Sequence, residues 1–364
     1  MMYRTKRFQG MILCVGLLVF STAHAQVIHT LKSIFGSKYE ESSGQLYVLA
    51  SILGTHGTAP NQLDHPDAIA VGPHNLYIVD TYNNRIVVWS KTGKVINTYG
   101  SWGTSAIYDE APNFFHPAGI MLSAHHQIYV ADTGNDRIVL LNKQGLVITS
   151  WGTPGQGSGN FNSPRSIDHD YYGNIWVLDS GNSRIEIFTP FGQFISAWGQ
   201  FGTQPGELQR PMGMALNFID QAIIADTGND RVEVFNSPSA QSTAVTIQGW
   251  LGSGPDEFRS PAGVVVTPNG ITAVIDGSTA RVEFYNNRFY YIGQWQAPAN
   301  LPLKHPPHFM GIASAQNGDL YITDIANSVI FKLKLLHPLP VVPIPPTPTP
   351  SNVSPYSGSD YPLR

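Results

Sequence analysis

The chain has 364 residues, of which 35 are Gly, 27 are Pro and 13% are charged, a composition typical of a turn-rich globular protein with a sizeable core. Its formal net charge is −4, which argues against a main role in binding the phosphate backbone of nucleic acids. The only cysteine is Cys14, so a disulfide within the chain and a cysteine metal site are excluded.

The first 25 residues have the organisation of a secretory signal peptide. Basic residues between Arg4 and Arg7 precede an apolar run over residues 11–20, and small residues end the segment at Ala25. The run is too short to span a bilayer, and no second long apolar stretch follows. We therefore expect cleavage before Gln26, loss of the only cysteine, and an exported protein, periplasmic or secreted, with no membrane span.

From residue 44 onward the sequence is an internal repeat of about 50 residues. In each unit a short apolar segment ends in Asp, and a turn leads from it into a second segment that begins, in five units, with Arg. A further segment lies upstream of each Asp and usually opens with proline, and a fourth follows the Arg segment. Segments of five or six residues that are rich in Val, Ile and aromatics and are separated by Gly, Pro and Asn are typical of β-strands. The repeat predicts an all-β fold, a six-bladed β-propeller of four-stranded antiparallel blades.

The chain ends allow ring closure to be predicted. The sixth unit has a third strand at residues 329–335 but then runs into prolines, so its fourth strand is missing. The segment GQLYVLASILG, residues 44–54, resembles the fourth strands of the other units. An N-terminal strand that completes the last blade would remove an open sheet edge.

The hexapeptide DTGNDR occurs twice, at residues 132–137 and 226–231, and related turns occur in the other units. Asp accepts hydrogen bonds from turn N–H groups, Gly and Asn tolerate left-handed conformations, and Arg reaches back to a carboxylate or carbonyl. We interpret these as structural turns, with a calcium loop as the alternative, although the carboxylate spacing differs from that of an EF-hand. The predicted turn residues are Asp80 and Arg85, Asp132 and Arg137, Asp179 and Arg184, Asp226 and Arg231, Asp276 and Arg281, and Asp324.

The repeat unit resembles the NHL repeat. The stretch GNFNSPRSI…VLDSGNSRIEIF…GQFISAWG, within residues 159–199, carries most of the motif, and the resemblance extends over about residues 44–335. It implies the propeller fold. It leaves function open, because NHL propellers include protein-binding and RNA-binding modules, extracellular sensor domains and the amidating lyase of peptide hormone maturation.

The resemblance to the lyase branch implies zinc-binding histidines directly after the blade-opening prolines. None of the matching positions is His: they are Asp67, Ala118, Arg165, Met212, Ala262 and Met310. Histidines occur nearby, at His65 and His116 before two of the prolines, and at His305 and His308 in a Pro-rich loop. G-x-S-x-G, H-E-x-x-H and P-loop motifs are absent. We predict no metal ligand, no catalytic residue and no cofactor, with calcium or zinc as the open alternatives.

Departures from the repeat mark candidate binding residues. The loop between Gly100 and Pro117 is longer than most of its counterparts and carries Trp102, Tyr108 and Phe114, while Tyr82 replaces the expected Gly of the first turn. An aromatic patch of this kind grips peptides or sugars; the alternative is a loop that packs onto its own blade. Asp67 and Arg165 are charged at the channel mouth, as ligand-binding residues or as a solvated pair.

We therefore expect an exported, monomeric propeller that acts as a non-catalytic scaffold for protein or peptide partners, or glycans, and not for nucleic acid. The alternative is a secreted metal-dependent lyase or hydrolase related to the amidating lyase, with its site in the central channel. The predicted organisation is a signal peptide (1–25), a segment with a short helix (26–43), the NHL propeller (44–336) and a Pro-rich disordered tail (337–364).

Overall fold

The structure is a computed structural model that describes residues 46–236, 244–249 and 251–336. The predicted signal peptide, the segment 26–43 with its predicted helix, and the tail 337–364 lie outside the described residues. Within the described ranges, no helix is both long and apolar enough to cross a membrane.

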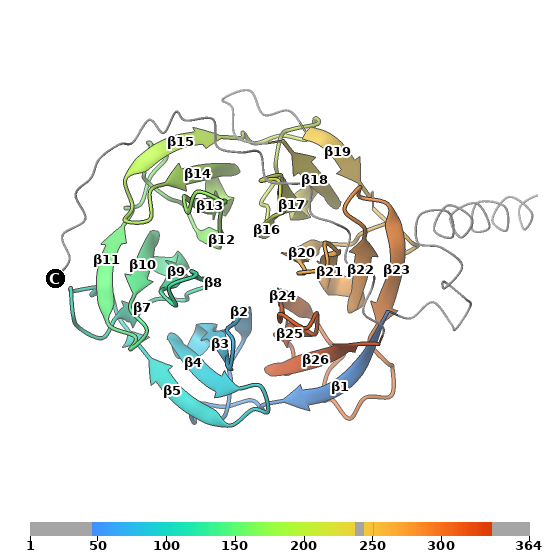
Figure 1. The fold of residues 1–364 in the computed structure, drawn as a ribbon, viewed down its shortest axis with the longest axis horizontal. Helices are drawn as coiled ribbons and strands as arrows, with labels where there is room; N and C mark the ends of the chain where they lie inside the picture. The colour runs from blue at the N-terminus through green and yellow to red at the C-terminus, as the bar shows by residue number, and fades with distance from the viewer. Residues whose placement is uncertain (1–45, 237–243, 250, 337–364) are drawn as a thin grey trace, which may run out of the picture. The chain divides into compact units, whose positions relative to one another are not determined.

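Six four-stranded antiparallel sheets form the blades of a β-propeller (Figure 1). Blade 1 contains β2 (Pro66–Val71), β3 (Asn75–Asp80), β4 (Arg85–Ser90) and β5 (Val95–Tyr99). Blade 2 contains β8 (Gly119–Leu122), β9 (Ile128–Asp132), β10 (Arg137–Leu141) and β11 (Val147–Trp151). Blade 3 contains β12 (Pro164–His169), β13 (Ile175–Asp179), β14 (Arg184–Phe188) and β15 (Phe194–Trp198). Blade 4 contains β16 (Gly213–Leu216), β17 (Ala222–Asp226), β18 (Arg231–Phe235) and β19 (Ala244–Gln248). Blade 5 contains β20 (Pro261–Val266), β21 (Thr272–Asp276), β22 (Arg281–Tyr285) and β23 (Tyr291–Gln296). Blade 6 contains β24 (Phe309–Ser314), β25 (Leu320–Asp324), β26 (Val329–Leu335) and β1 (Tyr47–Leu53).

The predicted fold class and ring closure are confirmed. β1 pairs antiparallel with β26, from Tyr47 opposite Leu335 to Leu53 opposite Ile330, so the strand nearest the N-terminus completes the last blade. This pairing ties two segments that lie far apart in sequence and covers the outer edge of β26.

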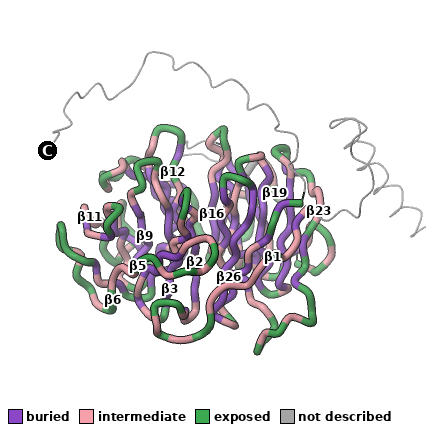
Figure 2. Tube along the Cα trace, turned by 60° about the horizontal axis from the view of Figure 1, so that its bottom comes forward, coloured by how far each residue is buried: buried purple, intermediate pink, exposed green. Residues whose placement is uncertain are grey.

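The core consists of six apolar clusters, and each lies between two adjacent blades. All five residues of β9, β13, β17, β21 and β25 are buried, because neighbouring blades cover both faces of each second strand. Figure 2 shows this buried interior beneath exposed loops. Full burial of a Val, Leu, Ile or Phe side chain contributes about 1.5–3 kcal/mol, so packing between blades is the main source of stability.

Strand direction gives the ring two different faces. The face that we call the mouth carries the starts of the first strands and the turns between the second and third strands. Three-residue 3-10 helices form five of these turns: η1 (Thr81–Asn83), η2 (Thr133–Asn135), η3 (Ser180–Asn182), η4 (Thr227–Asn229) and η5 (Gly277–Thr279). The opposite face, which we call the far face, carries the hairpins between first and second strands.

Candidate active site

The Asp that ends each second strand is held by the fold itself. In blade 4, Asp226 is fully buried and accepts hydrogen bonds from the Gln209 N–H at 2.6 Å, from Asn229 Nδ2 at 2.7 Å and from Arg231 Nε at 2.9 Å. The Arg231 guanidinium also donates to three carbonyl oxygens of the preceding loop, those of Thr203, Gln204 and Glu207. These contacts occupy the polar groups of the turn and tie it to the loop before it.

The second Asp of the hexapeptide connects one blade to the next. Asp230 accepts a hydrogen bond from the Ser260 N–H at 2.9 Å, and the Thr227 hydroxyl donates to the Pro261 carbonyl at 2.7 Å. Equivalent contacts join Asp136 to Ser163 and Asn84 to His116, and Ser328 to His65 across the closing junction between blades 6 and 1.

Blade 1 departs from this pattern in the middle of its turn. Gly134, Gly181 and Gly228 occupy that position in blades 2 to 4, where an added Cβ would lie 2.5–2.6 Å from a backbone carbonyl oxygen of the preceding loop. Blade 1 has Tyr82 there, and its N–H donates to the Asp64 carbonyl at 3.1 Å, against 2.8 Å for the three glycines. The longer hydrogen bond gives room for a side chain at the mouth.

A histidine and a carboxylate flank the first proline of blade 1. His65 Nδ1 lies 2.9 Å from Asp67 Oδ1, and Asp67 is only 7% exposed. From blade 3, an Arg165 guanidinium nitrogen lies 3.5 Å from Asp67 Oδ2. The intervening position in blade 2 is the small Ala118, which leaves room for blades 1 and 3 to meet across the channel.

These side chains line a cavity of about 590 Å³ at the channel mouth. Its other walls come from Thr81, Tyr82, His116, Thr133, Gly134 and Ser163. An aromatic row borders it: the His65 and Tyr82 rings stack at 4.3 Å and 15°, Tyr82 lies 5.5 Å from His116, and His116 stacks on Phe115 at 4.5 Å.

The repeat fixes the backbone of His65 and His116. Both have left-handed φ values, 54° and 46°, and so do the residues before the prolines of blades 3 to 5, Ser163, Arg210 and Ser260. The left-handed conformation is therefore shared by the blades. Histidine occupies this position in blades 1 and 2, whose side chains line the cavity.

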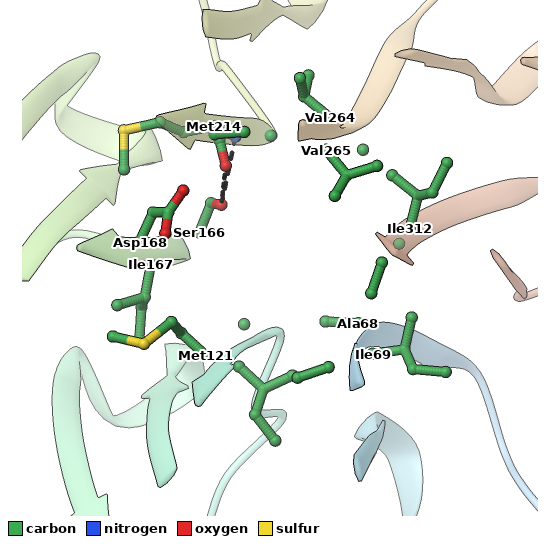
Figure 3. Close-up of a pocket in the computed structure, with 18 of the residues that line it drawn as sticks. Ala68, Ile69, Met121, Ser166, Ile167, Asp168, Met214, Val264, Val265 and Ile312 are labelled. Atoms are coloured by element: carbon green, nitrogen blue, oxygen red, sulfur yellow. Dashed lines mark hydrogen bonds between the residues drawn. The ribbon is translucent and has the colours of Figure 1, made fainter. Parts of the chain in front are cut away.

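A second cavity, of about 330 Å³, continues down the channel between the six inner strands. Figure 3 shows Ile69, Met121, Met214 and Ile312 around it, and the Ser166 hydroxyl hydrogen-bonded to the Met214 backbone. At the far end, the pKa of His169 is raised, first by its hydrogen bond with Asp168. The channel thus has ionisable groups at both ends and apolar side chains in between.

The structure does not bring the other predicted binding residues to this cavity. Phe114 is fully buried in the core between blades 1 and 2, as in the alternative of a loop packed on its blade. Tyr108 precedes Asp109, whose N–H donates to the Val147 carbonyl at 2.8 Å, at the end of β11 away from the mouth. Trp102 is exposed in β6 (Ser101–Trp102), which pairs with β7 (Asn113–Phe114). Asp67, Tyr82 and Arg165 do line the cavity.

His65 lines the cavity, although the channel positions expected from the sequence are those directly after the blade-opening prolines. The signal that would have found it is the pair His65 and Asp67 around Pro66, because blade 1 alone combines a histidine before the proline with a carboxylate after it.

The side chains that line the cavity at the mouth do not form a set of metal ligands. Among the described residues, no three or more His, Asp, Glu or Cys side chains are placed to hold a metal ion. At the mouth, the guanidinium of Arg165 occupies the place beside Asp67 where a metal-binding site would need another ligand.

Comparisons with known proteins support the fold by structure and not by sequence. No family model and no curated protein sequence matches the chain. A gluconolactonase from Xanthomonas campestris is similar over 79% of this chain and 98% of its own, with 15% identity and a TM-score of 0.56. A streptogramin B lyase is similar over 79% and 98%, with 12% identity and a TM-score of 0.55.

A third similar structure is a catalytically inactive His-to-Ala variant of virginiamycin B lyase from Staphylococcus aureus with quinupristin. It covers 82% of this chain and 84% of its own, at 13% identity and a TM-score of 0.50. The TM-scores and the coverage show a shared six-bladed propeller fold. Since the neighbours are enzymes, they correct the expectation of a non-catalytic scaffold for protein or peptide partners; that expectation rested on missing motifs, which a site assembled from separate blades does not need.

Proposed function

We propose that this protein is a lyase or hydrolase with its active site at the mouth of the central channel. The observation that carries the proposal is the His65–Asp67 pair facing Arg165 in one cavity. A base, a group that orients it and a fixed positive charge are the parts that acid–base catalysis on a carbonyl compound requires.

His65 is the proposed general base. A carboxylate oxygen only accepts hydrogen bonds, so Nδ1 of His65 carries the proton that bonds to Asp67, and Nε2 is left as the basic nitrogen. Nε2 takes a proton from a carbon acid in a lyase reaction or from water in a hydrolysis. The imidazolium that results is stabilised by the Asp67 carboxylate, and it then returns the proton to the leaving oxygen.

Arg165 is the proposed electrophilic group. As the reaction proceeds, negative charge develops on the oxygen of the attacked or enolised carbonyl, and a positioned guanidinium stabilises that oxygen more than it stabilises the neutral substrate. Asp67 keeps the side chain in place from the opposite wall. Within the part of the chain that the structure describes, no group of side chains is placed as a metal-ligand set, so the proposed steps use His65, Asp67 and Arg165 alone.

The similar structures suggest two substrates for the first assay, a streptogramin B antibiotic and gluconolactone. His65→Gln should lower kcat/KM about 10²–10⁴-fold, the usual contribution of a general base. His305→Gln is the matched control, since His305 is an exposed histidine of the same face outside the cavity.

Equal activity of both variants and the parent chain would overturn the assignment of His65. An active parent with inactive H65Q and H305Q variants of unchanged thermal stability would place the chemistry elsewhere on this face. Turnover of neither substrate by the parent chain would reject both substrate classes.

We further propose that the ring is of the NHL type and is exported. The support is the repeat itself, which carries A-D-T-G-N-x-R turns in blades 2 and 4, and the signal-like first 25 residues. The measurements are the compartment in which the protein is found and its N-terminal residue there. Protein in the periplasm or medium that begins at Gln26 is expected, and a chain that stays in the cytoplasm with Met1 intact would contradict export.

A further inference from the structure

The far face carries an apolar patch on two neighbouring blades. The hairpin tips of blades 3 and 4 expose Tyr171 (73%), Tyr172 (77%), Phe218 (52%) and Ile219 (56%). The equivalent tips of the other blades lack a large apolar residue: they carry Pro73 and His74, Ala124 and His125, Pro268 and Asn269, and Gln316 and Asn317. Large apolar side chains that gather on two adjacent tips form an exposed patch of the kind that marks an interaction site.

The patch is built as a unit. The Tyr171 N–H donates to Asp220 Oδ1 at 3.1 Å, which joins the two tips. The Tyr171 and Tyr172 rings are perpendicular, with centroids 5.6 Å apart and an interplanar angle of 84°. Two aromatic faces at a right angle form the kind of ridged surface on which polyproline II segments dock.

The chain itself supplies such a segment on the same face. β26 runs from the mouth to the far face, where the Leu335 N–H donates to Asp319 Oδ1 in the β24–β25 hairpin and the Leu336 N–H donates to the Leu46 carbonyl. The sequence that follows, PLPVVPIPPTPTP at residues 338–350, has the composition of a polyproline II ligand.

Reach and tethering both favour this segment. Blade 3 lies across the ring from blade 6 (Figure 1). A domain of this size is about 50 Å across, and the patch lies on tips near the inner strands. Residues 338–350 alone would span about 40 Å at about 3.1 Å per residue. A tethered segment also binds at an effective concentration in the millimolar range, which a free partner rarely reaches.

We propose that the Pro-rich segment 338–350 crosses the far face and docks on the patch formed by Tyr171, Tyr172, Phe218 and Ile219. This interaction is independent of the chemistry at the mouth. It covers the apolar side chains with the protein's own chain.

A spin label tests the proposal in the full chain. Thr347→Cys combined with Cys14→Ser gives one labelling position, because Cys14 is the only cysteine. The readouts are the methyl NMR signals of Ile219 in the patch and of Ile96, which is 52% exposed on blade 1, next to the blade from which the tail leaves. We expect the Ile219 signal to lose most of its intensity and the Ile96 signal to keep it.

A patch variant supplies the control. Tyr171→Ser with Tyr172→Ser should restore the Ile219 signal without lowering the melting temperature, because both side chains are exposed. Broadening equal at both methyls or stronger at Ile96, or loss at Ile219 that persists in the patch variant, would overturn the proposal. A mixture separates docking within one chain from docking between chains. If the Ile219 signal of an isotope-enriched chain without spin label broadens when a spin-labelled chain is added, the patch binds the tail of a second copy, which also overturns docking within one chain.

Discussion

Blades 1 and 4 place different side chains on the same mouth backbone. In both, a left-handed residue precedes the blade-opening proline, and a buried Asp accepts hydrogen bonds from the following Asn and Arg. Blade 4 fills the remaining positions with Arg210, Met212 and Gly228, whereas blade 1 has His65, Asp67 and Tyr82. The positions that obey the repeat hold the ring together, and those that depart from it are free for chemistry.

The buried turn carboxylate should produce the largest effect. Asp226→Ala removes the buried acceptor of the Gln209 N–H, Asn229 and Arg231 and leaves Glu233 as the only carboxylate paired with the Arg231 guanidinium. We therefore expect the free energy of unfolding to fall by about 3–5 kcal/mol, as measured in urea. Asp230→Ala in the same turn removes one hydrogen bond to the next blade and should cost about 0.5–1.5 kcal/mol. Equal losses for the two variants would contradict the different roles of the two Asp residues.

Arg165→Met tests the proposed electrophilic group, which stands at a position where the sequence departs from the repeat. We expect kcat/KM to fall about 10²–10³-fold, the usual effect of removing one donor to a developing oxyanion, while the melting temperature changes little. Arg210→Met is the control, since Arg210 is an exposed arginine of blade 4 on the same face. A loss of similar size in both variants would indicate that charge on the mouth face, and not Arg165, governs the rate.

The two blades also differ two residues after the turn Arg, with Val87 in blade 1 and Glu233 in blade 4. Burial raises the pKa of Glu233 to about 7, although Arg231 opposes the shift. In the unfolded chain this carboxyl loses its proton at lower pH, so the stability that it contributes is present below its ordinary pKa and is lost as the pH rises through about 7.

Glu233→Gln should therefore flatten the pH dependence of stability. We expect the free energy of unfolding to fall less between pH 5 and pH 8 than in the parent chain, by about 1–2 kcal/mol. The measurement is urea unfolding at both pH values. A parent chain that becomes more stable over this interval would contradict the sign.

Tyr82→Gly makes the turn of blade 1 like that of blade 4 and should have the smallest effect. Loss of the ring that stacks on His65 should lower kcat/KM about 2–10-fold, which corresponds to the 0.5–1.5 kcal/mol of an aromatic pair. Trp102→Ala removes an exposed aromatic outside the cavity and serves as the control. An unchanged rate for Tyr82→Gly would show that the Asp67 hydrogen bond alone positions His65.

The sequence by itself determined the fold because the repeat is written in local chemistry. Strand and turn residues alternate with a period of about 50 residues, with an Asp in every unit and an Arg in five of them, and this pattern leaves few architectures. Because the last unit lacks its fourth strand, the segment at residues 44–54 is needed to close the ring. Tyr82, Asp67 and Arg165 were also recognisable as departures from the pattern.

Only the tertiary structure shows which of the residues that depart from the repeat lie close together. Asp67 and Arg165 are 98 positions apart in the chain, and the curvature of the ring, with the small Ala118 between them, brings their side chains within 3.5 Å. Phe114 lies in the same loop as Trp102 and Tyr108 but is buried, because it occupies the repeat position that the fully buried Leu63, Phe161, Leu208 and Phe258 fill in other blades. Side-chain direction and inter-blade distance depend on packing over the whole ring, and a single unit of the repeat does not encode them.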